Sequence, residues 1–196
     1  MNFKKLQQMQ AKLDEAILAD KAPMTAEERF NKTLVALSVE IAEVANCAEH
    51  FKFWKDNKGK VDRDKFSVIH YGNTDNEYYQ HGISCIYSFE QAHRLTLIEE
   101  CSDALHFILS LANQADFEIN GMEFLLKDGY FSKEDEYRNL QALINYYKIT
   151  DNYQWIRAVI ESFCCYTSNL GVEFKELEQA YYDKNKINYE RLENGY

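Results

Sequence analysis

Residues 90–117 read EQAHRLTLIEECSDALHFILSLANQADF, and this stretch decides the fold class. Its apolar side chains return at steps of three and four residues, which is the spacing of an α-helix. The whole chain of 196 residues contains only one proline and seven glycines. Because sandwiches, barrels and doubly wound sheets need many tight turns, this scarcity favours helices throughout.

Helical patterns continue outward from this stretch in both directions. Pro23 ends the first helix, and the second begins with a capping box, in which Thr25 and Glu28 satisfy each other's backbone N–H groups. The patterns predict an all-α protein, a compact bundle of about six or seven helices in a single domain over residues 1–196. The other helices are predicted over residues 2–20, 25–55, 132–148, 151–169 and 173–190, with a short helical piece between Gly121 and Gly129.

The helical pattern is lost between residues 57 and 91. Lys, Asp, Asn, Gly and His are frequent there, and Phe66-Ser67-Val68-Ile69 is a short apolar fragment. We expect a long loop or insertion, in which a short strand or a turn of helix can form. Loops of this length are usually functional lids or insertions.

Composition excludes several classes of protein. The chain carries 22 Lys and Arg against 32 Asp and Glu, a formal net charge of −10. An acidic protein is poorly suited to bind a nucleic-acid backbone. The negative net charge does not exclude a nucleotide that is bound through metal ions. No apolar run approaches the roughly 20 residues of a membrane span, and the first residues do not read as a signal peptide. The five cysteines show no C-x-x-C spacing, so buried reduced thiols are expected. We expect a soluble, cytoplasmic protein that binds neither nucleic acid nor membrane.

Two pairs of carboxylates occupy helix faces that are otherwise small and apolar. Glu40 and Glu43 lie one turn apart, and Glu100 and Asp103 repeat the arrangement with Phe107 between them on the helical wheel. Neither helix offers a Lys or Arg near its pair. Buried carboxylates repel each other, so a divalent cation would compensate them, and an all-oxygen ligand set favours Mg²⁺ over Zn²⁺. The alternative is that both pairs are solvated on exposed faces.

A further group stands near the C-terminal end of the chain. Lys184, Asn188 and Arg191 recur at steps of four and three residues, hence on one helical face. Two cations flanking an amide suit a phosphate clamp. A solvated basic stretch is the alternative.

Five segments of the chain together resemble a known family, the all-α nucleoside triphosphate pyrophosphohydrolases, and within it the dimeric-type dUTP diphosphatases. MazG-type relatives share the carboxylates but generally lack the last segment, so the resemblance favours the dUTP branch. The matching segments are residues 9–14 (MQAKLD), 40–43 (EIAE), 51–55 (FKFWK), 100–110 (ECSDALHFILS) and 182–196 (YDKNKINYERLENGY).

The resemblance implies a homodimer that hydrolyses dUTP to dUMP and diphosphate. It implies two or three Mg²⁺ ions, with Mn²⁺ as a substitute, at the carboxylates Glu40, Glu43, Glu100 and Asp103. One glutamate, such as Glu43, would take the proton from the attacking water. The expected substrate-binding residues are Gln10, Asp14, Trp54 and Phe107 around the base, and Lys52, Lys184, Asn188 and Arg191 at the phosphates.

Two other functions stay open at this point. One is a MazG-like pyrophosphohydrolase for another nucleotide such as dCTP, with the same metal chemistry. The other is a non-enzymatic helical interaction protein of the same fold. Phe107 could equally be an ordinary core residue, Trp54 a loop anchor, and Lys52 a solvated charge.

Overall fold

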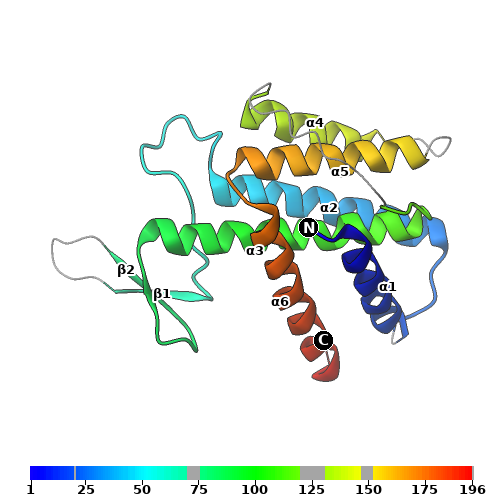
Figure 1. Cartoon of the computed structure of the whole chain (residues 1–196), viewed down its shortest axis with the longest axis horizontal. Coiled ribbons are helices and arrows are strands. Elements are labelled where there is room, and N and C mark those ends of the chain that lie inside the picture. Colours follow the sequence, from blue (N-terminus) through cyan, green and yellow to red (C-terminus); the bar gives the residue numbers. More distant parts are fainter. Residues whose placement is uncertain (20, 70–75, 120–130, 147–151, 196) are drawn as a thin grey trace.

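The computed structural model describes residues 1–19, 21–69, 76–119, 131–146 and 152–195. These residues form six helices and a small sheet of three strands, which confirms the predicted mostly helical fold (Figure 1). The predicted piece between Gly121 and Gly129 lies outside the described residues. The helices are α1 (Phe3–Ala19), α2 (Ala26–Ala48), α3 (Phe89–Gln114), α4 (Lys133–Asn145), α5 (Asn152–Asn169) and α6 (Phe174–Glu193).

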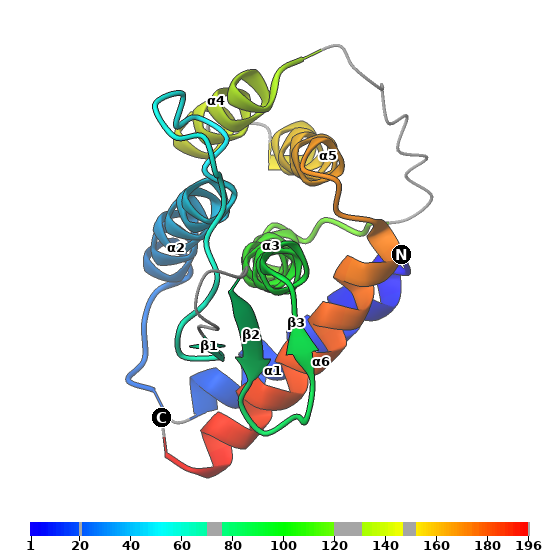
Figure 2. The ribbon, with the colours of Figure 1, turned by 90° about the vertical axis from the view of Figure 1, so that its left-hand side faces the viewer.

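Helix α3 is the centre of the fold, as Figure 2 shows in a view along its axis. It packs against α2 and α6 most extensively, and also against α1 and α5, while α4 covers α5 and α2. Its apolar residues are buried on several sides, among them Leu97, Cys101, Leu105 and Leu111. The most apolar stretch of the sequence is therefore the helix that the others surround.

Helix α2 ends earlier than its pattern predicts. The pattern continues to Lys55, whereas α2 ends at Ala48, because Glu49 adopts the left-handed conformation with φ of 52°. The Glu49 carboxylate is buried and accepts bonds from Lys52 Nζ at 2.7 Å, from Lys55 Nζ, and from the Gly59 N–H at 3.0 Å. Burial would raise the pKa of Glu49, but these bonds lower it to about 2. One ionised side chain thus organises the turn after α2.

The segment between α2 and α3 contains more regular structure than the single short strand that its sequence suggests. It contains a sheet in the order β1-β2-β3 with antiparallel pairing, and α3 already begins at Phe89. Phe66 and Tyr78 are buried and form a small apolar cluster with Ala92 of α3. Contacts with α3 thus stabilise strands too short to show a clear period. The strands are β1 (Phe66–Ile69), β2 (Glu77–Gln80) and β3 (Ile86–Tyr87).

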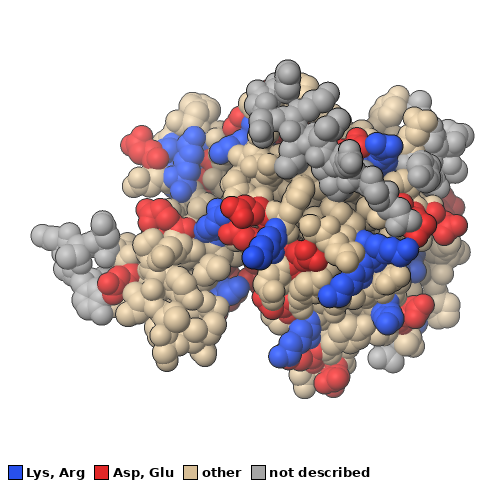
Figure 3. All heavy atoms as spheres, in the orientation of Figure 1, with Lys and Arg blue, Asp and Glu red and all other residues tan. Residues whose placement is uncertain are grey.

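The cysteines follow the prediction in part. Cys47, Cys101 and Cys164 are free and buried, whereas Cys165 is half-buried and Cys85 is exposed. None of the helices described is both long enough and apolar enough to cross a membrane. On the face shown in Figure 3, acidic and basic side chains are interspersed.

Candidate active site

Three of the four predicted carboxylates meet where α2 packs on α3. Glu40 of α2 and Glu100 and Asp103 of α3 each offer an oxygen, and these oxygens all lie within 4.8 Å of one another. The i,i+3 spacing places Glu100 and Asp103 on one side of α3, facing α2. All three side chains are half-buried.

Glu43, the fourth predicted carboxylate, lies outside this close group. Its side chain is exposed, one turn beyond Glu40. Its charge nevertheless raises the pKa of both Glu40 and Glu100, so it stands close enough to interact with them.

The carboxylate cluster carries more negative charge than its surroundings compensate. Burial, followed by the charges of Asp103 and the neighbouring glutamates, raises the pKa of Glu40 to about 7. Burial and the same kind of repulsion raise the pKa of Glu100 to about 7. A cluster of this kind takes up protons or cations, and its hard oxygen ligands suit Mg²⁺ or Mn²⁺. The residues present therefore fit a divalent metal ion.

A cation from a third helix, α6, reaches the carboxylate cluster. The spacing of residues within α2 and α3 could not predict this contact between helices. Lys184 of α6 places its Nζ 2.7 Å from Asp103 Oδ2 and 3.6 Å from Glu99 Oε1. Burial still raises the pKa of Asp103 above its ordinary value, although the ion pair opposes this. One ammonium group therefore compensates the cluster only in part.

A cavity of about 300 Å³ opens beside the carboxylate cluster, between α1, α2, α3 and α6. It brings together eight of the twelve predicted site residues, from four separate parts of the sequence. A volume of this size suits a small organic group such as a nucleoside. The predicted residues that line it are Gln10, Asp14, Glu40, Asp103, Phe107, Lys184, Asn188 and Arg191.

Asp14 lines one wall of this cavity, and its carboxylate accepts three hydrogen bonds. Its carboxylate accepts hydrogen bonds from Gln10 Nε2 at 2.7 Å, from Ser110 Oγ at 2.7 Å and from Arg29 at 3.0 Å. Burial raises the pKa of Asp14, and these three partners oppose the shift. Asp14 thus ties α1 to α2 and α3.

Two of these cavity residues, Arg29 and Ser110, were missed in the sequence, although a signal for both is present. Arg29 stands eleven residues before Glu40, and Ser110 seven residues after Asp103. At 100° per residue both separations return to nearly the same face of the helix. A search along the helix face of each carboxylate pair, two or three turns beyond the pair, would have identified both residues.

Trp54 and Lys52, two of the predicted binding residues, lie elsewhere in this structure. Trp54 is 65% exposed and meets Phe51 and Phe53 edge-on. Lys52 binds the buried carboxylate of Glu49. Neither residue lines the cavity beside the carboxylates.

Comparison with known families gives one finding. A family model described as dUTPase matches residues 2–71 and 88–196. The match covers all six described helices and every residue of the carboxylate cluster and of the cavity. It omits residues 72–87, which hold β2 and β3. Among curated proteins, none matches the chain significantly.

Proposed function

The chain belongs to the dimeric all-α dUTPase family, whose members hydrolyse dUTP to dUMP, and we propose that its carboxylate cluster holds the divalent ions used in this reaction. The observation that carries the proposal is the approach of Glu40, Glu100 and Asp103 oxygens to within 4.8 Å of one another. We assign the same role to Glu43, one turn from Glu40. Mg²⁺ is the ion that this oxygen-only ligand set favours, with Mn²⁺ as a substitute.

The reaction needs a water activated beside the triphosphate. When bound, divalent ions neutralise phosphate charge and lower the pKa of such a water. Glu43 is exposed at the edge of the cluster, so its carboxylate oxygens are accessible to take the proton. Lys184 and Arg191 line the cavity next to Asp103 and can stabilise the negative charge that develops on the phosphate oxygens. Asn188, on the same face of α6, can donate its amide N–H groups.

The base would enter the cavity between α1 and α3. Phe107 is half-buried and lines this space, so its ring can contact the base. The bonds from Gln10, Arg29 and Ser110 to Asp14 hold that wall in place. These groups orient the substrate so that the phosphates extend towards the carboxylates.

We also propose that the enzyme acts as a homodimer in the cytoplasm. The family, which is the dimeric all-α dUTPase family, supports the dimer. Val35 and Val39, one turn apart on α2 and 65% and 49% exposed, are apolar side chains that a second subunit could cover. Light scattering combined with size-exclusion chromatography tests the oligomeric state.

Conservative variants of the carboxylates test the metal site. Glu40→Gln and Asp103→Asn should each lower kcat for dUTP at least about 100-fold, because an amide cannot hold a divalent ion as a carboxylate does. Glu27→Gln, at an exposed position of the same helix α2, is the matched control and should retain full activity. Full activity of Asp103→Asn, or activity of the wild type in excess EDTA, contradicts the proposal.

A further inference from the structure

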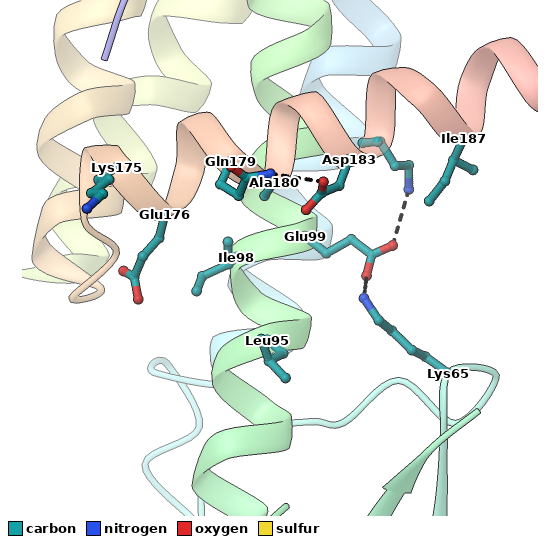
Figure 4. A pocket seen from close by; sticks show the side chains of 11 residues that line it. Lys65, Leu95, Ile98, Glu99, Lys175, Glu176, Gln179, Ala180, Asp183 and Ile187 are labelled. Carbon is teal, nitrogen blue, oxygen red and sulfur yellow. Dashed lines mark hydrogen bonds and ion pairs between the residues drawn. The ribbon is translucent and has the colours of Figure 1, made fainter. Parts of the chain in front are cut away.

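Lys184 lies between two carboxylates that belong to different cavities. Its Nζ is 2.7 Å from Asp103 Oδ2 in the carboxylate cluster and 3.6 Å from Glu99 Oε1. The other oxygen of Glu99 pairs with Lys65, which precedes β1. Figure 4 shows the Glu99 carboxylate with an ion pair on each side, one of them to Lys65.

Lys184 borders two cavities, one on the side of Asp103 and one on the side of Glu99. Lys184 lines the cavity beside the metal ligands and also a second cavity of about 580 Å³ between α3 and α6. Asp103 lines the first cavity, and Glu99 lines the second. The side chain of Lys184 is 13% exposed, and among the described residues Asp103 and Glu99 are its ion-pair partners within 4.0 Å.

The present position of Lys184 conflicts with a metal ion on Asp103. An ammonium group on Asp103 Oδ2 competes with a divalent cation for the same carboxylate, and the two positive charges repel each other. Glu99 resolves the conflict, because it accepts the ammonium without being one of the clustered metal ligands. Lys65 holds Glu99 from the other side and so keeps its carboxylate directed at Lys184.

We propose that Lys184 is an internal counter-ion of Asp103, which yields to the metal ion and moves to Glu99, so that Glu99 is a positioning residue for the phosphate-binding lysine. This inference rests on the proposed metal site. It explains how the cluster is partly neutralised without a metal ion, and how Lys184 remains close to the phosphates once the metal ion is bound. In this proposal Glu99 positions Lys184, although Glu99 does not belong to either of the carboxylate pairs predicted from the sequence.

Metal binding without nucleotide tests the exchange, with Mn²⁺ as the probe and electron paramagnetic resonance or calorimetry as the measurement. Lys184→Met should bind Mn²⁺ about tenfold more tightly than the wild type, because no ammonium competes for Asp103. Lys186→Met removes the same charge from the same helix at a position 79% exposed, and should leave the affinity unchanged. Equal or weaker binding by Lys184→Met overturns the proposal.

A double-mutant cycle separates exchange from simple attraction between charges. Glu99→Gln should weaken Mn²⁺ binding, since Lys184 then stays on Asp103, and this effect should largely vanish in the Lys184→Met background. Additive effects overturn the exchange. A crystal structure with Mn²⁺ alone should place Lys184 Nζ nearer Glu99 than Asp103, and an unchanged Asp103 pair overturns it as well.

Asp103→Asn distinguishes failure of this inference from failure of the proposed function. If Asp103→Asn binds Mn²⁺ as well as the wild type, the metal site itself is wrong. If it loses Mn²⁺ while Lys184→Met gains nothing, the metal site stands and only the exchange is wrong.

Discussion

The side-chain oxygen of Gln10 lies 2.7 Å from His106 Nδ1 and joins α1 to α3 beside the cavity. Gln10 Nε2 donates to Asp14, whose carboxylate can only accept, so the orientation of the Gln10 amide is fixed. His106 must therefore donate from Nδ1. Burial, followed by the charge of Lys184, lowers the pKa of His106 to about 3, and its ring stacks on Tyr181 at 4.1 Å between centroids. A neutral histidine thus supports the wall of the cavity.

Replacing Gln10 by Leu should disrupt this wall. The change leaves His106 Nδ1 without its acceptor and Asp14 without one donor in a buried place, which lowers the free energy of unfolding by about 2–3 kcal/mol. We also expect a higher KM for dUTP, because Asp14 and its partners lose their fixed position. Urea denaturation and steady-state kinetics measure the two effects. Gln8→Leu, at an exposed position of α1, is the matched control and should change neither quantity. An unchanged KM in Gln10→Leu contradicts a role of this contact in binding.

Glu49 should be the main stabilising residue of the turn after α2. Glu49→Gln leaves two ammonium groups without their counter-ion, while the amide oxygen can still accept from the Gly59 N–H. We expect the free energy of unfolding to fall by about 1–3 kcal/mol. Lys55→Met should cost less than about 1 kcal/mol, because that side chain is 41% exposed and Lys52 still pairs with Glu49. Denaturation curves compare the two variants, and a larger loss in Lys55→Met contradicts this assignment.

Gly59 is needed for both its backbone conformation and its close contact. Its φ is +109°, and a Cβ there would lie 2.9 Å from ring atoms of His93. The Lys60 carbonyl holds that ring in place at 2.8 Å. Gly59→Ala should therefore lower stability by about 2–4 kcal/mol. Gly82→Ala, with φ of +75° and no atom within 4 Å of the added Cβ, isolates the backbone strain and should cost about 1 kcal/mol. Similar losses in both variants would show that the contact with His93 is unimportant.

The helices and the two carboxylate pairs were predictable because both depend on local spacing. Steps of three and four residues place apolar side chains on one face, and the same steps pair Glu40 with Glu43 and Glu100 with Asp103. The position of Lys184 opposite Asp103 was not predictable in this way. It depends on the packing of α6 on α3, which joins residues 81 positions apart in the sequence.

The end of α2 and the small sheet depend on contacts that sequence periodicity does not show. Glu49 is a good helix former, and only its buried bonds to later residues of the turn account for its left-handed conformation. Phe66 and Tyr78 stand in short, mixed segments whose strand character comes from burial against α3. Residues 72–87 also lie outside the family match, so the resemblance offered no guide to them.

The stability of the metal-free protein should fall as the pH rises. Glu40 and Glu100 have a pKa of about 7 when folded, against an ordinary value of 4.5. A raised carboxyl pKa means that the protonated form stabilises the fold, and this stabilisation is lost as the pH rises from about 4.5 through 7. Glu49 does not oppose the trend, because its pKa of about 2 makes its contribution constant above about pH 5. His106 opposes it below about pH 6.5, since folding lowers its pKa from 6.5 to about 3, but one histidine offsets only part of the effect of two glutamates.

Mg²⁺ should reverse this trend, because it binds the ionised carboxylates. We expect Mg²⁺ to raise the melting temperature more at about pH 8 than at about pH 5.5, where protons compete with it. Calorimetry in EDTA and in Mg²⁺ at the two pH values measures the difference. Glu40→Gln should flatten the curve in EDTA. The assignment of the raised pKa values is wrong if the metal-free melting temperature rises with pH, or if Mg²⁺ gives the same shift at both values.

Base preference tests whether the cavity between α1 and α3 binds the nucleoside. We expect kcat/KM for dUTP to exceed that for dCTP by about 100-fold or more, because cytosine exchanges a donor and an acceptor and leaves buried polar groups of the wall unpaired. Phe107→Ala should raise KM for dUTP, since the ring lines this cavity and can stack on the base. Phe53→Ala removes a ring that is 89% exposed and lies outside the cavity, so it should leave KM unchanged. If Phe53→Ala raises KM and Phe107→Ala does not, the base binds at the turn after α2 and not in this cavity, while the metal chemistry at Glu40, Glu100 and Asp103 is unaffected.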